Sequence, residues 1–132
     1  MKLDTNGLDS HMLEECLPFV DYVALDVKTS PEKYPLLGAS GAAELIQTAE
    51  ILKMGKVEYE FRTTVVPGFA DASDMQAMCE IVKGARTWAL QQFVPGDTLD
   101  KSLNDVKPYL PDEVRARTAS IEDYAERIVF RF

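Results

Sequence analysis

Cysteine is scarce in this chain of 132 residues, which contains only Cys16 and Cys79. The two lie far apart, and neither has a second cysteine at the spacing that zinc and iron–sulfur sites use. Two thiols also do not make the disulfide framework of a small secreted domain. The cysteine content therefore argues against a metal-binding knuckle and predicts a protein of the reducing cytoplasm.

Basic residues are outnumbered, and long apolar runs are lacking. The chain has 14 lysines and arginines against 22 acidic residues, which gives a net charge of -8. Such a charge repels nucleic acids and anionic membranes. No apolar run approaches the roughly 18 residues of a membrane span, and the first residues lack the basic and apolar segments of a signal peptide. We therefore expect no nucleic-acid partner, no membrane partner and no export.

Two common catalytic signatures are missing as well. The sequence has no glycine-rich phosphate loop and no recognisable set of serine, histidine and aspartate. Its one histidine, His11, is expected on a solvated helix. The length suits one domain with its own core, and no repeat or linker divides the chain. We therefore expect a single domain over residues 1–132.

The chain does contain a repeated switch between strand-like and helix-like periodicity. Helical spacing predicts four helices, near residues 10–17, 41–55 and 73–82 and from Pro111 onward. Runs rich in β-branched and aromatic residues predict five strands, near residues 2–6, 20–28, 56–66, 87–93 and 127–132. Strands that alternate with helices pair in parallel through right-handed crossovers.

The expected helices carry further local signals. An apolar stripe defines the second helix and consists of Ala42, Leu45, Ile46, Ala49 and Leu52. Gly55 follows where a C-cap glycine belongs. Ser73 and Gln76 predict a capping box for the third helix. Met75, Met78 and Cys79 are expected on the core face of that helix.

The expected second and third strands each have one apolar and one polar face. The apolar positions are Val23, Leu25 and Val27, and then Val57, Tyr59, Phe61 and Val65; the polar face of the third strand carries Glu58, Glu60, Arg62 and Thr64. A doubly wound sheet is apolar on both faces, whereas a polar face suits the lumen of a barrel. We therefore predict an α/β fold: a partial (β/α) barrel with about five parallel strands alternating with four helices.

Two strand-like runs end in an acid, Asp4 and Asp26. An unpaired buried carboxylate is costly, so these ends face either solvent or a site. In parallel α/β folds, ligands bind at the carboxyl ends of the strands. Lys28, Arg62 and one of Gln91 or Gln92 are expected at the same rim.

Two other interpretations of these charges remain open. They could neutralise each other within the lumen, as Glu60 with Arg62 and Asp26 with Lys28. A lone lysine after a strand also suits a Schiff-base nucleophile of a barrel lyase, with Lys28 in that role.

Four segments, in order, resemble a known family: DTNG at 4–7, ALDVK at 24–28 followed by EKYPLLG, EFRTTVVPGFAD at 60–71 and LQQFVPG at 90–96. They are similar to the second half of the radical S-adenosylmethionine activating enzymes, which include the activases of anaerobic ribonucleotide reductase and of pyruvate formate-lyase. The resemblance covers nearly the whole chain. It implies a cytoplasmic, anaerobic oxidoreductase that, when intact, cleaves S-adenosylmethionine reductively and makes a glycyl radical on a partner enzyme.

The resemblance also implies roles for individual residues. Lys28 and Arg62 match positions that contact adenosylmethionine, and its carboxylate in particular. Thr5 matches a neighbour of that ligand, and Gln92, with Phe93, matches a contact to adenine or to the partner peptide.

A second implied site holds a monovalent cation beside the methionine end of the ligand. Its matching oxygen ligands are Asp4, Thr5, the carbonyl of Ala24 and Asp26.

The chain departs from the family in one respect. Family members bind a four-iron cluster through a CxxxCxxC loop, and a Gly-Gly stretch follows it; neither occurs in these 132 residues. The resemblance thus implies the C-terminal half of a partial barrel without its cluster-binding N-terminal half. We expect this chain alone to be inactive and to bind adenosylmethionine weakly or not at all, with the [4Fe-4S] cluster confined to the intact parent. The alternative is a non-catalytic binding or assembly module, and we expect self-association through an exposed edge strand at residues 2–6.

Overall fold

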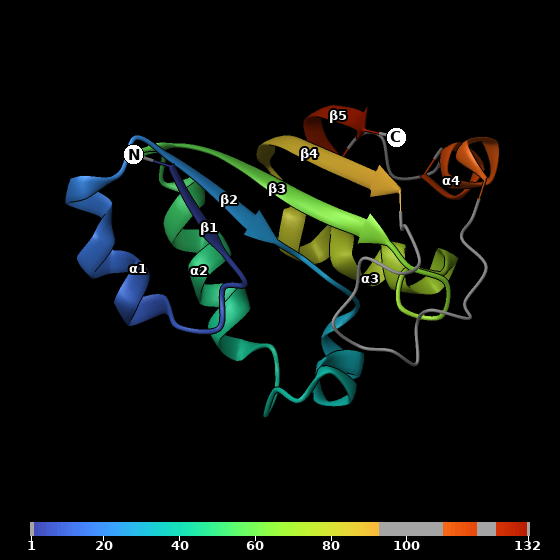
Figure 1. Cartoon of the computed structure of the whole chain (residues 1–132), viewed down its shortest axis with the longest axis horizontal. Helices are drawn as coiled ribbons and strands as arrows, with labels where there is room; N and C mark the ends of the chain where they lie inside the picture. The colour runs from blue at the N-terminus through green and yellow to red at the C-terminus, as the bar shows by residue number, and fades with distance from the viewer. Residues whose placement is uncertain (1, 93–109, 119–123, 132) are drawn as a thin grey trace.

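The computed structural model describes residues 2–92, 110–118 and 124–131 (Figure 1). Its strands are β1 (Lys2–Thr5), β2 (Tyr22–Asp26), β3 (Glu58–Val65), β4 (Ala85–Gln92) and β5 (Ala125–Arg131). Its α-helices are α1 (Ser10–Cys16), α2 (Ala43–Lys53), α3 (Ala72–Val82) and α4 (Pro111–Thr118). Two short 3-10 helices, η1 (Leu17–Phe19) and η2 (Pro31–Leu37), precede and follow β2.

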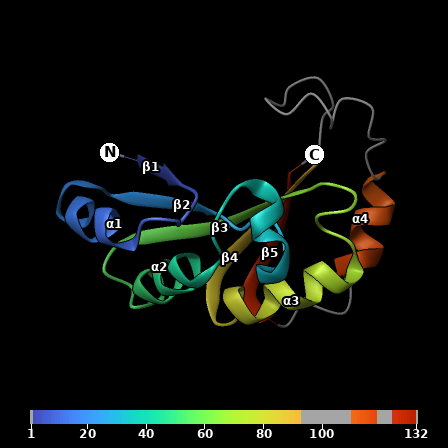
Figure 2. The ribbon, with the colours of Figure 1, turned by 90° about the horizontal axis from the view of Figure 1, so that it is seen from below.

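The five strands form one parallel sheet in the order β1-β2-β3-β4-β5. The predicted α/β fold with five parallel strands is confirmed. Strand order follows chain order, and α1, α2 and α3 lie on the same side of the sheet (Figure 2). This one-sided winding is that of a partial (β/α) barrel and differs from a doubly wound sheet, which carries helices on both faces.

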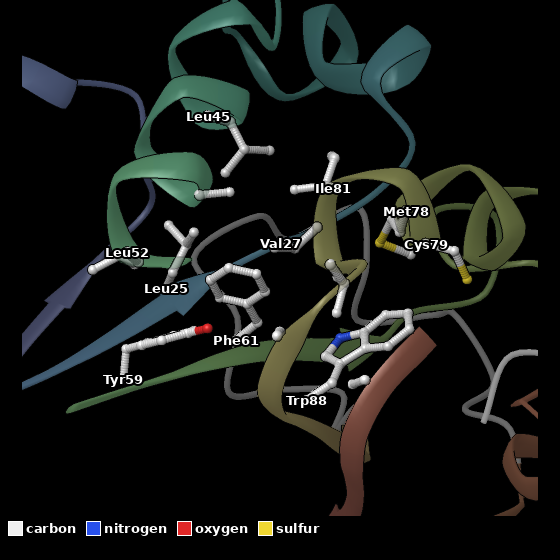
Figure 3. Packing of buried hydrophobic residues seen from close by; sticks show 14 of the residues in the cluster. Leu25, Val27, Leu45, Leu52, Tyr59, Phe61, Met78, Cys79, Ile81 and Trp88 are labelled. Carbon is white, nitrogen blue, oxygen red and sulfur yellow. The ribbon is translucent and has the colours of Figure 1, made fainter. Parts of the chain in front are cut away.

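The core lies between the sheet and these helices. Leu25, Phe61 and Trp88 project from β2, β3 and β4 toward Leu45 of α2 and Met78 of α3, and all five are fully buried (Figure 3). Burial of such side chains contributes roughly 1.5–3 kcal/mol each. The predicted apolar faces of β2 and β3 are therefore the faces that the helices cover.

The core also satisfies its buried polar groups. Trp88 Nε1 donates a hydrogen bond to Thr63 Oγ1 at 2.9 Å, and the same hydroxyl donates to the carbonyl oxygen of Val27 at 2.7 Å. An indole that finds a partner in this way costs little to bury. These hydrogen bonds link β4, β3 and the residue that directly follows β2, on the side of the sheet that the helices cover.

The helix signals were correct in part. Leu45, Ala49 and Leu52 are buried, but Ile46 is 43% exposed, so the buried stripe of α2 is narrower than predicted. Gly55 follows the helix with a φ of 79°, as a C-cap glycine should.

The capping box at α3 uses different residues from those predicted. The helix begins at Ala72, so Ser73 lies inside its first turn and Asp71 is the N-cap. The side chain of Asp71 accepts the N3 backbone N–H, and Asp74 Oδ2 accepts the backbone N–H of Asp71 at 3.2 Å. The aspartate pair performs the reciprocal capping expected of Ser73 and Gln76.

Other predictions concern exposure. His11 is exposed on α1, and Met75, Met78 and Cys79 are fully buried on α3, as predicted. Within residues 2–92, 110–118 and 124–131, no helix combines the length and apolarity needed to cross a membrane.

Candidate functional site

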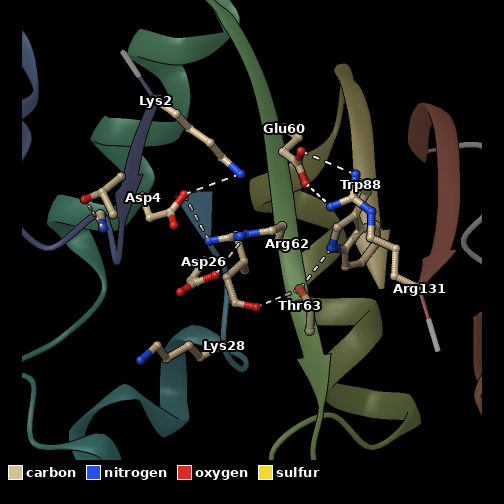
Figure 4. A network of polar contacts seen from close by, with 12 residues as sticks. Lys2, Asp4, Asp26, Lys28, Glu60, Arg62, Thr63, Trp88 and Arg131 are labelled. Carbon is tan, nitrogen blue, oxygen red and sulfur yellow. Dashed lines mark hydrogen bonds and ion pairs between the residues drawn. The ribbon is translucent and has the colours of Figure 1, made fainter. Parts of the chain in front are cut away.

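The sheet face turned away from the helices, here called the polar face, carries most of the charged strand residues (Figure 4). The strand register places on it the side chains of Lys2, Asp4, Asp26, Glu58, Glu60, Arg62, Gln91, Arg127 and Arg131. Paired residues of parallel strands point to the same side, so these side chains face one common space. The prediction of one polar and one apolar face is confirmed for β2 and β3.

The first group on this face, the Arg62 cluster, consists of Lys2, Asp4, Asp26 and Arg62. Arg62 Nη2 lies 3.5 Å from Asp4 Oδ1, and Arg62 Nε lies 3.5 Å from Asp26 Oδ1. Lys2 Nζ lies 3.8 Å from Asp4 Oδ1. These separations are those of ion pairs without close hydrogen bonds.

Arg62 has a donor that is ion-paired but makes no hydrogen bond to the described residues. Its Nε atom is buried and has no hydrogen-bond partner in the part of the chain that the structure describes. A buried guanidinium N–H without a partner is costly, which points to a group that the site is built to accept.

The electrostatics of this cluster affect Asp26. Burial raises the pKa of its carboxyl, the charges of Arg62 and Lys28 partly offset that rise, and the negative charge of Asp4 adds to it. Two carboxylates therefore share one guanidinium that does not fully neutralise them.

Lys28 lies just beyond β2, at the carboxyl end of the strand, and is exposed. Its backbone N–H donates to the hydroxyl of Tyr34 at 3.0 Å. The carboxylate of Asp26 forms its ion pair with Arg62, and the alternative pair of Asp26 with Lys28 is not formed. Lys28 and Arg62 thus lie on either side of Asp26, near the same rim (Figure 4).

The second group, the Arg131 cluster, consists of Tyr22, Glu60 and Arg131. Arg131 Nη1 lies 2.6 Å from Glu60 Oε2, Arg131 Nη2 lies 3.4 Å from Glu60 Oε1, and the Tyr22 hydroxyl donates to Glu60 Oε1 at 2.7 Å. The alternative pair of Glu60 with Arg62 is therefore wrong, because Glu60 is already saturated. Sequence reasoning missed Arg131; the recurrence of arginine at 127 and 131 was the available signal.

The Arg131 cluster also sets the acidity of its members. Glu60 is 4% exposed, and burial alone would raise its pKa, but hydrogen bonds from Arg131 and Tyr22 outweigh burial and hold the pKa below its ordinary value. Burial and the Glu60 carboxylate raise the pKa of Tyr22 to about 12. Glu60 therefore stays ionised and Tyr22 stays protonated at neutral pH.

Two predicted site residues lie on the other face of the sheet. Thr5 pairs in register with Leu25, on the helix side, and its Oγ1 accepts the backbone N–H of Gly7 at 3.1 Å. Gln92 pairs with Val65, also on the helix side, whereas Gln91 is on the polar face. The structure thus brings together Asp4, Asp26, Arg62 and Lys28 but places the side chains of Thr5 and Gln92 elsewhere.

Ala24 lies in the middle of β2, between Asp4 of β1 and Glu60 of β3 in the register. Its methyl group is on the polar face and is fully buried. Its carbonyl belongs to a strand that is paired on both sides.

The donor set fits some of the groups that the resemblance implies. Arg62 Nε, which makes no hydrogen bond to the described residues, suits a carboxylate ligand, and the oxygens of Asp4 and Asp26 suit a hard cation. No group of three or more His, Cys, Asp or Glu residues that could hold a metal ion occurs among the described residues. A four-iron cluster does not fit, because Cys16 is on α1, and Cys79 is buried on α3 where burial raises its thiol pKa to about 11.

Comparisons with known proteins agree with the motifs. No protein-family model matches the chain. A Methanocaldococcus jannaschii protein described as a "putative glycyl-radical enzyme activating enzyme" is 30% identical over an alignment of 139 positions, which covers 99% of this chain and 58% of that protein. The chain therefore covers a little more than half of this relative, and the resemblance to the activating enzymes is confirmed over nearly all of the chain.

A solved structure agrees with the fold. The crystal structure of a domain of pyruvate-formate lyase-activating enzyme from Bacteroides vulgatus has a TM-score of 0.74 to this chain, with 13% identity. The match covers 99% of this chain and 80% of that domain.

Proposed function

We propose that this relative of the glycyl-radical activating enzymes is the part of a radical S-adenosylmethionine activase that holds the amino-acid end of adenosylmethionine. The observation that supports the proposal is the buried Nε of Arg62, without a hydrogen-bond partner among the described residues, between two carboxylates at the rim of the sheet. The fork of a guanidinium pairs best with a carboxylate, which the methionine moiety provides.

The proposed roles follow from charge and position. Arg62, fixed on β3, binds the ligand carboxylate, and Lys28, just beyond β2, adds a second positive charge. When Arg62 turns to the ligand, Asp4 and Asp26 lose the cation that they share and keep only the more distant charges of Lys2 and Lys28. We propose that a monovalent cation then binds between these two carboxylates, with further oxygens from the strand ends.

The proposed whole activity needs more than this chain. In an intact activase an iron–sulfur cluster supplies the electron for reductive cleavage of adenosylmethionine, and the glycyl-radical enzyme is the partner. Because two buried or half-buried cysteines on separate helices do not fit a cluster, the proposed role of this chain alone is binding without cleavage.

Titration of the chain with adenosylmethionine, followed by NMR, tests the binding site. We expect a dissociation constant in the millimolar range, about -4 kcal/mol, because most anchoring groups of a complete site are missing. Arg62→Ala or Lys28→Ala should remove most of the shifts. Glu58→Ala is the matched control, since Glu58 is on the same strand and face but pairs with Arg86 at 3.3 Å. Shifts at the amino ends of the strands, or shifts that survive both substitutions, would mean that the proposed location of the site is wrong.

Anaerobic reconstitution with iron and sulfide tests the missing cluster. We expect no stoichiometric four-iron absorbance from this chain, since its two thiols cannot supply three clustered ligands. One stable cluster per chain would contradict the proposal.

A second candidate role, assembly, rests on one observation. Among the described strands, β1 pairs only with β2, so its other edge presents unpaired backbone groups that can accept a further strand. We propose self-association through this edge, and light scattering at high concentration should show a dimer or larger species. A monodisperse monomer would argue against it.

The Schiff-base lyase is disfavoured. A nucleophilic lysine is activated by desolvation, and Lys28 is exposed. Borohydride trapping of a carbonyl compound on Lys28 would reverse this preference.

A further inference from the structure

The segments that follow β2 and β3 are fastened to each other by one buried carboxylate. Asp74 of α3 is 3% exposed. It accepts a hydrogen bond from Ser30 Oγ at 2.9 Å and forms an ion pair with Lys33 Nζ at 2.7 Å. Lys33 Nζ also donates to the carbonyl oxygen of Gly68 at 2.7 Å. Three donors, counting the N–H of Asp71, satisfy a carboxylate that would otherwise be costly to bury.

A second set of contacts ends at Lys28. The hydroxyl of Thr29, fully buried, donates to the carbonyl oxygen of Phe69. Tyr34, 1% exposed and part of the core, accepts the backbone N–H of Lys28 with its hydroxyl. Lys28 lies outside β2, which ends at Asp26. The Tyr34 hydroxyl therefore accepts a backbone N–H beyond the end of the strand.

We propose that Tyr34 and Asp74 are positioning residues that hold Lys28 beside Arg62 by locking the segments after β2 and β3 into one unit. The inference rests on the proposed function of Lys28 and Arg62. Arg62 needs no such help, since β3 fixes its backbone. Lys28 carries a flexible side chain on an irregular segment, so its backbone must be held if its charge is to reach the ligand at little entropic cost.

The test compares two buried tyrosines in the full chain. Tyr34→Phe removes the hydroxyl that accepts from Lys28. Tyr59→Phe removes a hydroxyl from the same core, near the start of β3 and at the opposite end of the strands from Lys28. Tyr34→Phe should speed hydrogen exchange of the Lys28 amide about tenfold, the equivalent of about 1.4 kcal/mol, and Tyr59→Phe should leave it unchanged.

Affinity provides the second measurement. Tyr34→Phe should weaken binding of adenosylmethionine several-fold relative to Tyr59→Phe at matched thermal midpoints, so that general destabilisation is not the cause. Asp74→Asn should change the NMR chemical shifts of the backbone amides in both the segment after β2 and the segment after β3. If Asp74→Asn does not fold, Ser30→Ala, which removes a single donor to Asp74, is used in its place.

The outcomes separate the two proposals. Unchanged exchange at Lys28 in Tyr34→Phe overturns the positioning role, and so does altered exchange without a change in affinity. If the unsubstituted chain does not bind adenosylmethionine, the proposed function fails. The exchange comparison then still decides whether Tyr34 holds Lys28.

Discussion

The two arginines of the polar face are held in opposite ways. Arg131 makes a close, two-point contact with Glu60, at 2.6 and 3.4 Å, and Tyr22 completes the shell of that carboxylate. Arg62 touches two carboxylates at 3.5 Å each and keeps a buried N–H without a hydrogen-bond partner among the described residues. A saturated pair stabilises a fold, whereas an unsaturated one has capacity left for a ligand.

The pKa values of the acids also distinguish the two clusters. In Glu60, hydrogen bonds prevail over burial and the pKa is lowered; in Asp26, burial prevails over the neighbouring charges and the pKa is raised. The same sheet face thus contains one acid that is more stable ionised and one that resists ionisation.

The largest expected effect comes from breaking the saturated cluster. Glu60→Ala removes the buried carboxylate that half-buried Tyr22 and exposed Arg131 share, and we expect a loss of about 2–3 kcal/mol in the free energy of unfolding. Urea denaturation measures it. Glu58→Ala, two residues earlier on the same face, removes an exposed ion pair and should cost less than about 0.5 kcal/mol. Equal losses would contradict the distinction between saturated and exposed pairs.

The next prediction tests the backbone after β1, the strand that carries Asp4 of the Arg62 cluster. The side chains of that cluster are loosely paired, and the prediction asks whether the backbone next to them is loosely held as well. Gly7, after β1, has a φ of 75°, and a Cβ there would lie 2.6 Å from Leu25 Cδ1 and 2.7 Å from Leu45 Cδ1. Gly7→Ala should cost about 1–3 kcal/mol from backbone strain and overpacking.

Gly38→Ala is the control for this change. Gly38 has a φ of 90°, but a Cβ there meets nothing within 4 Å, so only the backbone strain of about 1 kcal/mol should remain. Thermal or urea unfolding compares the two. A smaller loss at Gly7 than at Gly38 would mean that the loop after β1 yields readily.

A smaller effect is expected when the unsaturated arginine is removed. Arg62→Met keeps the apolar stem and deletes two ion pairs to partly exposed acids, so the free energy of unfolding should change by less than about 1 kcal/mol. Urea denaturation at neutral pH checks this. A loss above about 2 kcal/mol would show that Arg62 is structural and would remove the argument for a ligand.

The smallest effect is a difference in pH dependence. The folded pKa of Glu60 lies below 4.5, so its stabilisation is present above pH 4.5 and is lost as the pH falls through the folded value. The folded pKa of Asp26 lies above 3.8, so stability declines as the pH rises from 3.8 through the folded value. Glu60→Gln should flatten the acid side of the stability profile, and Asp26→Asn should raise stability slightly at pH 7. Unfolding curves between about pH 3 and pH 7 should show these opposite signs.

The sequence predicted most of the fold because β2 and β3 alternate strictly. Each has one face for the helices and one for charges, and that pattern alone separates a barrel from a doubly wound sheet. β4 follows the same pattern, since Ala89 separates Trp88 and Leu90 as Ala24 separates Val23 and Leu25 in β2. Its last two residues, Gln91 and Gln92, are of the same type, so residue type alone does not show that Gln91 and not Gln92 is on the polar face.

The charge partners could not be predicted for a different reason. Glu60 and Arg131 are 71 positions apart, and their contact depends on the register of three strands. Asp71 and Ser73 are both acceptable caps, and the choice depends on where the preceding segment turns. Predictions from residue types therefore located the rim and its acids but not which cation would serve which acid.

Because the order of strands in the sheet repeats their order in the chain, the topology bears on how the protein forms during synthesis. Each strand pairs with the one made before it, over separations of about 20 to 40 residues, and the entropy of closing such loops rises only slowly with length. A polypeptide leaving the ribosome then offers every new strand a template that already exists. We expect ribosome-stalled chains to become protease-resistant in steps, one for each completed β/α unit.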